Sequence, residues 1–116
     1  MFFKKVVESP ELIADDNTRL REIFHPDLHA VKANYSIAHV HLAVGEAALP
    51  HRIKSSETYY ILQGVAKLYV NDEVQLMSKD SIAHVPANAL QFIENVGSDE
   101  LVYLCIVEPA WRASED

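Results

Sequence analysis

Short runs rich in Val, Ile, Leu and Tyr recur from Tyr35 to Val107, with turn-forming residues between them. Runs of this length and spacing are typical of β-strands joined by tight turns. The pattern therefore predicts an all-β fold, an antiparallel sandwich or jelly-roll barrel. Strands are predicted at 35–44, 49–54, 58–62, 66–70, 73–77, 81–85, 90–95 and 101–107, and turns at 45–46, 55–56, 63–64, 71–72, 79–80, 86–89 and 97–99.

The first third of the sequence has a weaker pattern. Residues 2–7 predict a short strand, and residues 18–24 fit both helical spacing and a strand, of which we favour the strand. Residues 25–27 predict a turn, because the residue before Pro26 avoids the helical region. We expect a single domain over 1–116, with an N-terminal strand or extension at 1–34 and the barrel at 35–111.

Charge and composition exclude several classes of function. The chain has 17 acidic and 10 basic residues and a formal net charge of -7, which argues against nucleic-acid and membrane partners. Residues 1–7 are too short and too soon interrupted by charge for a signal peptide, so we expect a cytoplasmic protein. Cys105 is the single cysteine and lies in an apolar run, which predicts a buried strand thiol without a disulfide.

A histidine and a glutamate in the middle of the chain are the main candidates for a functional site. Because alternate residues of a strand share a face, His51 and Ile53 point one way and the charged Arg52 points the other. The same rule places Glu57 and Tyr59 together on the inward face of the next strand. Imidazole and carboxylate are ligands that transition metals prefer.

The spacing around these residues resembles the first motif of the cupin superfamily. That motif is Gly, five residues, His-x-His, three or four residues, Glu, six residues, Gly. Gly45, His51, Glu57 and Gly64 occupy the corresponding positions, and Ile53 stands where the second histidine would be.

The second cupin motif falls on residues 80–95. Pro86 and Asn95 match it, Asp80 and Asn88 replace its two glycines, and Gln91 replaces its histidine ligand. Asp and Asn tolerate positive φ better than other non-glycine residues, so both turns are expected to survive. The resemblance covers residues 35–111 and implies a cupin-type antiparallel β-barrel, the double-stranded β-helix or jelly roll.

By this resemblance the family's three histidines and one glutamate become His51, Ile53, Glu57 and Gln91. The expected metal ligands are therefore His51, Glu57 and Gln91, with Zn, Ni, Mn or Fe as the candidate divalent ion. This is a weaker donor set than the family's, because one ligand is lost and an amide replaces a second.

Two functions remain open from the sequence. The first is a metal-dependent protein acting on a small polar molecule, for which the resemblance implies dioxygenase, isomerase or decarboxylase chemistry. The second is a metal-free module that binds a sugar or carboxylate through His51, Glu57, Tyr59 and Gln91. A metal-free isomerase or epimerase, with His51 and Glu57 as acid and base, is a variant of the second.

The other histidines are weaker candidates. His39 and His41 share a face opposite apolar residues and are read as outward and solvated, or alternatively as lining the barrel mouth. His84 is read as structural, and His25 and His29 as solvent-facing. The apolar strand at 2–7 would leave an exposed sheet edge, and since similar cupins often pair through such edges, a homodimer is predicted.

Overall fold

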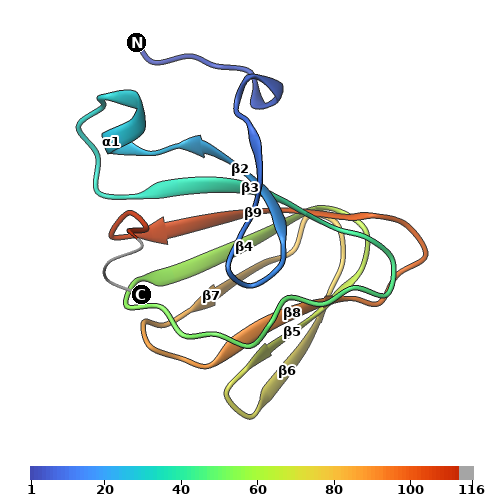
Figure 1. Ribbon diagram of the computed structural model, residues 1–116. Helices are drawn as coiled ribbons and strands as arrows, with labels where there is room; N and C mark the ends of the chain where they lie inside the picture. Colours follow the sequence, from blue (N-terminus) through green and yellow to red (C-terminus); the bar gives the residue numbers. More distant parts are fainter. Residues whose placement is uncertain (113–116) are drawn as a thin grey trace.

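Two antiparallel sheets that face each other make up the protein (Figure 1). The structure is a computed structural model that describes residues 1–112. The larger sheet has the strand order β1-β2-β3-β9-β4-β7, and the smaller has the order β6-β5-β8. The predicted all-β architecture is confirmed. The elements are η1 (Val6–Glu8), β1 (Glu11–Ile13), β2 (Arg19–Phe24), α1 (Pro26–His29), β3 (Ser36–Leu42), β4 (Ser56–Gln63), β5 (Ala66–Val70), β6 (Glu73–Met77), β7 (Ile82–Val85), β8 (Gln91–Asn95) and β9 (Leu101–Glu108).

Alternating burial along the central strands forms the core between the sheets. Strands β3 and β9 bury every second side chain, as a strand with one face against a core must. Val40, Leu42, Ile61, Ile93 and Leu101 are all at most 2% exposed. The inward face predicted for β4 is confirmed, because Glu57, Tyr59 and Ile61 are all buried while the residues between them are only half-buried.

The turns keep the backbone geometry of the motif glycines without all of the glycines. Asp80 and Asn88 have φ of 65° and 69°, which confirms the expectation that both residues adopt a positive φ in their turns. Gly64 has φ of 93°, and an added Cβ would lie 3.0 Å from the carbonyl oxygen of Glu100. Glycine is therefore required at position 64 for two reasons, its φ and the close approach of β9.

Two predicted strands are wrong. Residues 2–7 form no strand, because Glu8 accepts a hydrogen bond from the Lys5 backbone N–H at 2.6 Å and closes the single turn η1. Residues 2–7 therefore do not form the sheet edge on which the homodimer prediction rested; the Phe2 ring packs 5.6 Å from that of Phe24, while Phe3 and Val7 stay 76% and 72% exposed. The homodimer stays a prediction, which light scattering checks against the chain mass of 13.1 kDa.

The second wrong strand is 49–54, where only His51 pairs with a neighbouring strand, through a bridge to Gln91. The backbone groups on either side of His51 bond elsewhere, because Leu49 N donates to Asp16 O at 2.9 Å and Ile53 O accepts from Asn88 N at 2.8 Å, so no regular ladder with β8 forms. The expected strand at 18–24 is confirmed as β2, while the expected turn at 25–27 becomes the start of the short helix α1.

His25 is also placed differently from the prediction. It is 6% exposed rather than solvent-facing, and its Nδ1 accepts a hydrogen bond from the Asp27 backbone N–H at the start of α1. Its Nε2 lies 2.7 Å from the backbone oxygen of Trp111, and therefore donates to it. The imidazole joins α1 to the C-terminal segment, which gives it a structural role.

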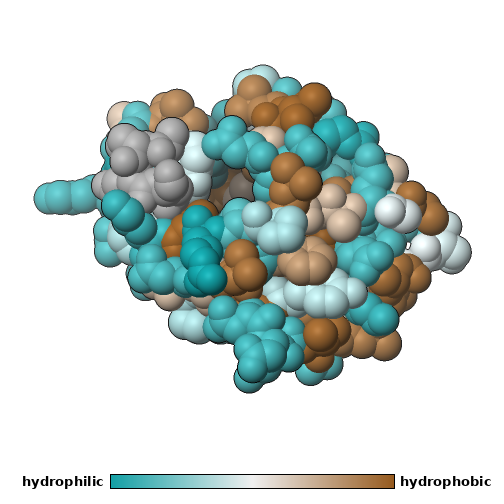
Figure 2. All heavy atoms as spheres, turned by 60° about the horizontal axis from the view of Figure 1, so that its bottom comes forward, coloured by the Kyte–Doolittle hydropathy of each residue, from teal (hydrophilic) through white to brown (hydrophobic). Residues whose placement is uncertain are grey.

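Apolar and polar residues are interspersed on the face of the molecule seen in Figure 2, and the apolar ones do not form a single large patch there. No helix among residues 1–112 is long and apolar enough to cross a membrane.

Candidate functional site

A cavity of about 480 Å³ lies between the inner face of the larger sheet and the segment around residues 49–53. Most of its wall is apolar, supplied by side chains such as Leu20, Val40, Ile53 and Val107. Polar side chains reach it from several elements, among them Asp16, Glu22, His51, Glu57 and Tyr59. Its volume falls in the roughly 300–1,000 Å³ range of small-molecule sites.

The turn between β1 and β2 forms part of the cavity wall. The Asp16 backbone oxygen accepts a hydrogen bond from Leu49 N at 2.9 Å, which joins this turn to the segment that carries His51. The Asp16 carboxylate accepts hydrogen bonds from Thr18 N at 3.1 Å and Thr18 Oγ1 at 2.7 Å. Its other oxygen lies 3.9 Å from His51 Nδ1, so Asp16 is held in a fixed position beside the imidazole.

His51 is oriented by its own backbone segment. Its N–H and C=O pair with those of Gln91 at 3.0 and 2.9 Å, which places both side chains on one face. His51 Nδ1 lies 3.0 Å from the Leu49 carbonyl oxygen, and because a carbonyl only accepts, Nδ1 is the protonated nitrogen. In that tautomer Nε2 is the acceptor.

Tyr59 and Gln91 form a buried pair at the inner end of the site. Tyr59 Oη donates to Gln91 Oε1 at 2.5 Å, and both side chains are at most 2% exposed. Burial, with the charge of Glu57 as a smaller contribution, raises the pKa of Tyr59 well above its usual value. Gln91 Nε2 has no hydrogen-bond partner within residues 1–112, and Gln91 does not itself line the cavity.

Glu22 is a cavity residue that the sequence analysis missed. It lies on β2 opposite Ala38, and both side chains line the cavity. Burial raises its pKa to about 7, although the charge of His25 opposes the rise. Its Oε1 is buried with no hydrogen-bond partner in the described part of the chain. The sequence did contain a hint of this position, because Leu20 and Glu22 share a face if residues 18–24 form a strand.

Cys105 also lines the cavity, and the expectation of a buried strand thiol is confirmed. Burial raises the pKa of this thiol well above its usual value, and the neighbouring Glu57 carboxylate raises it further. A thiol in this environment stays protonated at neutral pH and is a poor nucleophile.

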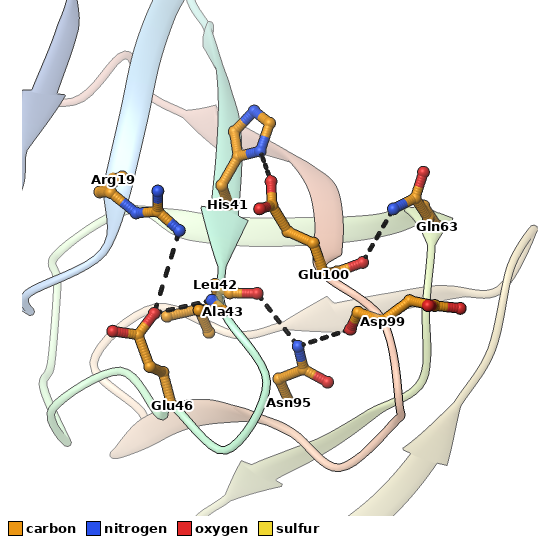
Figure 3. Close-up of polar contacts among 9 residues, drawn as sticks. All are labelled: Arg19, His41, Leu42, Ala43, Glu46, Gln63, Asn95, Asp99 and Glu100. Carbon is orange, nitrogen blue, oxygen red and sulfur yellow. Dashed lines mark hydrogen bonds and ion pairs between the residues drawn. The ribbon is translucent and has the colours of Figure 1, made fainter.

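The remaining histidine candidates lie away from the cavity. His39 and His41 are half-buried on the outer face of β3, with ring centroids 5.0 Å apart. His41 bonds to the Glu100 carboxylate (Figure 3). His84 is exposed on β7, where its Nδ1 lies 3.0 Å from Thr58 Oγ1. The reading of His39 and His41 as outward residues therefore holds.

The donor set does not fit a metal ion well. Ile53 supplies no donor, and the Gln91 amide oxygen already accepts a hydrogen bond from Tyr59. Within residues 1–112, no three His, Cys, Asp or Glu side chains are grouped closely enough to hold a metal ion. In a site built on His51, Glu57 and Gln91, the metal ion would share the Gln91 oxygen with the Tyr59 hydroxyl. That ligand set stays a prediction.

Comparison with known proteins gives one family. The model of that family, described as "Cupin domain", matches residues 38–107. Among curated proteins, the uncharacterized protein MJ1618 of Methanocaldococcus jannaschii is 30% identical over 100 residues, which cover 85% of this chain and 79% of that protein.

Solved structures share the fold at low sequence identity. A predicted oxalate decarboxylase from Thermotoga maritima has a TM-score of 0.80 at 16% identity, over 93% of this chain and 99% of that one. A Cupin 2 conserved barrel domain protein from Salinispora arenicola has a TM-score of 0.78 at 16% identity, over 99% and 92% of the two chains. The polyketide cyclase RemF from Streptomyces resistomycificus has a TM-score of 0.78 at 12% identity, over 93% and 79%.

Proposed function

The chain belongs to the cupin domain family, and from that premise we propose that its cavity binds a small organic molecule directly, through protein side chains rather than through a resident metal ion. The observation that carries the proposal is the cavity itself. It offers about 480 Å³ of space, bounded mostly by apolar side chains with a few polar groups that converge on it.

The polar groups support a binding role because they are held in place before any ligand arrives. Asp16 is fixed by two hydrogen bonds from Thr18, and the His51 imidazole by its bond to the Leu49 carbonyl. Tyr59 is fixed by its bond to Gln91. Side chains that are already ordered lose little rotamer entropy when a ligand binds, so more of the contact energy contributes to affinity.

The same hydrogen bonds favour metal-free binding over the metal-dependent alternative. Family chemistry would need several strong donors directed at one point, whereas Ile53 is apolar and the Gln91 oxygen is already engaged. An amide oxygen is also a weak ligand for a borderline transition metal. The predicted oxalate decarboxylase and the polyketide cyclase share only the fold with this chain, at 16% and 12% identity.

Cavity-filling substitution tests this function. Ala38 is 9% exposed on β3 and lines the cavity, so Ala38→Leu would place three added carbon atoms in the ligand's space. A small-molecule library is screened by thermal shift in the presence of a chelator, and compounds that stabilise the parent protein are retested on this variant.

We expect the stabilisation to disappear in Ala38→Leu and to persist in Ala87→Leu, a matched change at an exposed turn residue outside the cavity. The proposal would be contradicted by compounds that stabilise both variants equally. It would also be contradicted if stabilisation of the parent protein vanished whenever the chelator was present.

A further inference from the structure

The cavity is acidic for a site with so much apolar wall. Four carboxyl side chains line it, those of Asp15, Asp16, Glu22 and Glu57, against one guanidinium and one imidazole among the described residues. The guanidinium belongs to the exposed Arg52, whose Nη1 donates to the backbone oxygen of Asn88 at 2.8 Å. Carboxylates in an apolar setting gain most from a ligand that brings positive charge, because water is largely excluded there.

Hydrogen-bond polarity points in the same direction, independently of charge. Thr18 donates its hydroxyl hydrogen to Asp16, Tyr59 donates its own to Gln91, and His51 donates its Nδ1 hydrogen to the Leu49 carbonyl. These three side chains already use their donor hydrogens in bonds within the protein. What they can still offer a ligand is acceptor lone pairs. A ligand that matches this surface is rich in donors.

The negative field reaches the inner wall of the cavity. Burial is the main cause that raises the pKa of the Tyr103 hydroxyl well above its usual value, and the charges of Asp16 and Glu57 raise it further. Asp16 and Glu57 act in the same sense on Cys105. The negative charges of Asp16 and Glu57 therefore act on the same part of the cavity, around Tyr103 and Cys105.

We propose that the cavity selects an organic ammonium ion with an apolar body, an inference that rests on the proposed function. The ammonium group has three N–H donors and no acceptor, which matches the carboxylates and the hydroxyl lone pairs. The apolar body packs against Leu20, Ile53 and Trp111. A carboxylate ligand, one of the classes expected from sequence, would instead place like charges side by side.

The test uses matched ligands that differ only in the head group. Isotope-labelled protein is titrated by NMR with 2-phenylethylammonium, 2-phenylethanol and 3-phenylpropanoate, and then with the corresponding butyl compounds, all with a chelator present. In each series we expect the ammonium ion to bind about tenfold tighter than the alcohol, since a charge-assisted hydrogen bond is about twice as strong as a neutral one. The carboxylate should bind weakest.

Failure of the inference and failure of the proposed function give different results. If the alcohol or the carboxylate binds as tightly as the ammonium ion, the charge selection is wrong while the cavity remains a binding site. If no compound of either series binds, both are overturned.

Three variants identify the groups responsible. Asp16→Asn, Glu22→Gln and Glu57→Gln keep size and shape. At pH 8, above the Glu22 pKa of about 7, each should weaken ammonium binding about tenfold while leaving alcohol binding within about twofold. Glu73→Gln is the matched control, because Glu73 is exposed on β6 and does not line this cavity. Each variant is checked for a dispersed NMR spectrum, so that a misfolded one is set aside and the other two carry the test. Unchanged selectivity in the folded variants would overturn the inference.

Discussion

Two buried amides on β8, Gln91 and Asn95, show how differently the two ends of the barrel use the same chemistry. Both point inward and are at most 2% exposed. Asn95 Nδ2 donates to the backbone oxygens of Leu42 and Asp99 at 3.0 and 2.9 Å (Figure 3). Its Oδ1 accepts from Gly97 N at 3.0 Å. Gln91 bonds only through its oxygen, to Tyr59, and its Nε2 has no partner in residues 1–112.

We call the region of Leu42, Gly64, Asn95 and Leu101 the closed end, and the region of His51, Glu57 and Gln91 the cavity end. At the closed end the buried polar groups are used to hold strands and loops together. At the cavity end two buried atoms, Gln91 Nε2 and Glu22 Oε1, have no hydrogen-bond partner among residues 1–112, which costs stability and makes sense where a ligand binds. The comparison therefore predicts that equivalent substitutions have unequal effects at the two ends.

The largest effect is expected for Asn95→Ala. This change leaves the buried oxygen of Leu42 without its Asn95 donor, and it frees the loop after β8. We expect a loss of about 3 kcal/mol in the free energy of unfolding, since each orphaned buried group costs about 1–3 kcal/mol. Urea unfolding measures it, and a loss below about 1 kcal/mol would contradict the structural role of the closed end.

Gly64→Ala should have the next largest effect. The new Cβ would lie 3.0 Å from Glu100 O and 3.1 Å from Leu101 Cα, and the residue would keep a positive φ. We expect a loss of about 2 kcal/mol in unfolding free energy. Gly45→Ala is the control, because φ there is also positive but nothing lies within 4 Å of the added Cβ, and it should lose about 1 kcal/mol. Equal losses of unfolding free energy in Gly64→Ala and Gly45→Ala would show that the close contact with β9 does not contribute to stability.

At the cavity end, Glu22→Gln should stabilise the protein at alkaline pH. Because the folded-state pKa of about 7 lies above the usual 4.5, the folded protein holds a proton that the unfolded chain releases between these values. Stability therefore falls as pH rises from about 4.5 to 7, and levels off above. We expect Glu22→Gln to gain about 1 kcal/mol at pH 8 relative to pH 5, a figure reduced for the partial exposure of Glu22.

Unfolding curves at the two pH values, with Glu73→Gln as the exposed control, measure this difference. A gain of the same size at both pH values would mean that the substitution acts through packing and not through ionisation.

The smallest effect is expected for Gln91→Met. Methionine has a similar shape, removes the unpartnered Nε2 and leaves the Tyr59 hydroxyl without its acceptor, so the two changes oppose each other. We expect a change within about 1 kcal/mol in unfolding free energy. A loss as large as that of Asn95→Ala would remove the distinction between the two ends.

The strand pattern could be predicted from sequence wherever turns are local and one face is buried. The bounds of β5 and β6 match the prediction, and the positive φ of Asp80 and Asn88 followed from their side-chain type. Prediction failed at 49–54 and at 2–7. At 49–54 the backbone of Leu49 and Ile53 bonds to Asp16 and Asn88 instead of extending a ladder, and at 2–7 the Glu8 carboxylate closes a turn.

The cavity was predicted only in part, because three of its four acidic side chains, those of Asp15, Asp16 and Glu22, come from the N-terminal third of the chain. His51, Glu57 and Tyr59 were singled out and all line the cavity. Asp16 reaches it only through the β1–β2 turn, whose contact with Leu49 no local pattern encodes. Glu22 was hidden because the helix and strand readings of residues 18–24 assign its side chain to different faces.

Metal content tests the central claim most directly, namely that the cavity end serves an organic ligand and not a resident ion. Elemental analysis is done on protein purified without a histidine tag, before and after incubation with Zn²⁺, Ni²⁺, Mn²⁺ or Fe²⁺ and desalting. We predict less than about a tenth of an equivalent of each metal in both samples, as expected for a site without a closed donor set. Close to one equivalent of bound metal that is lost in His51→Ala would contradict the account.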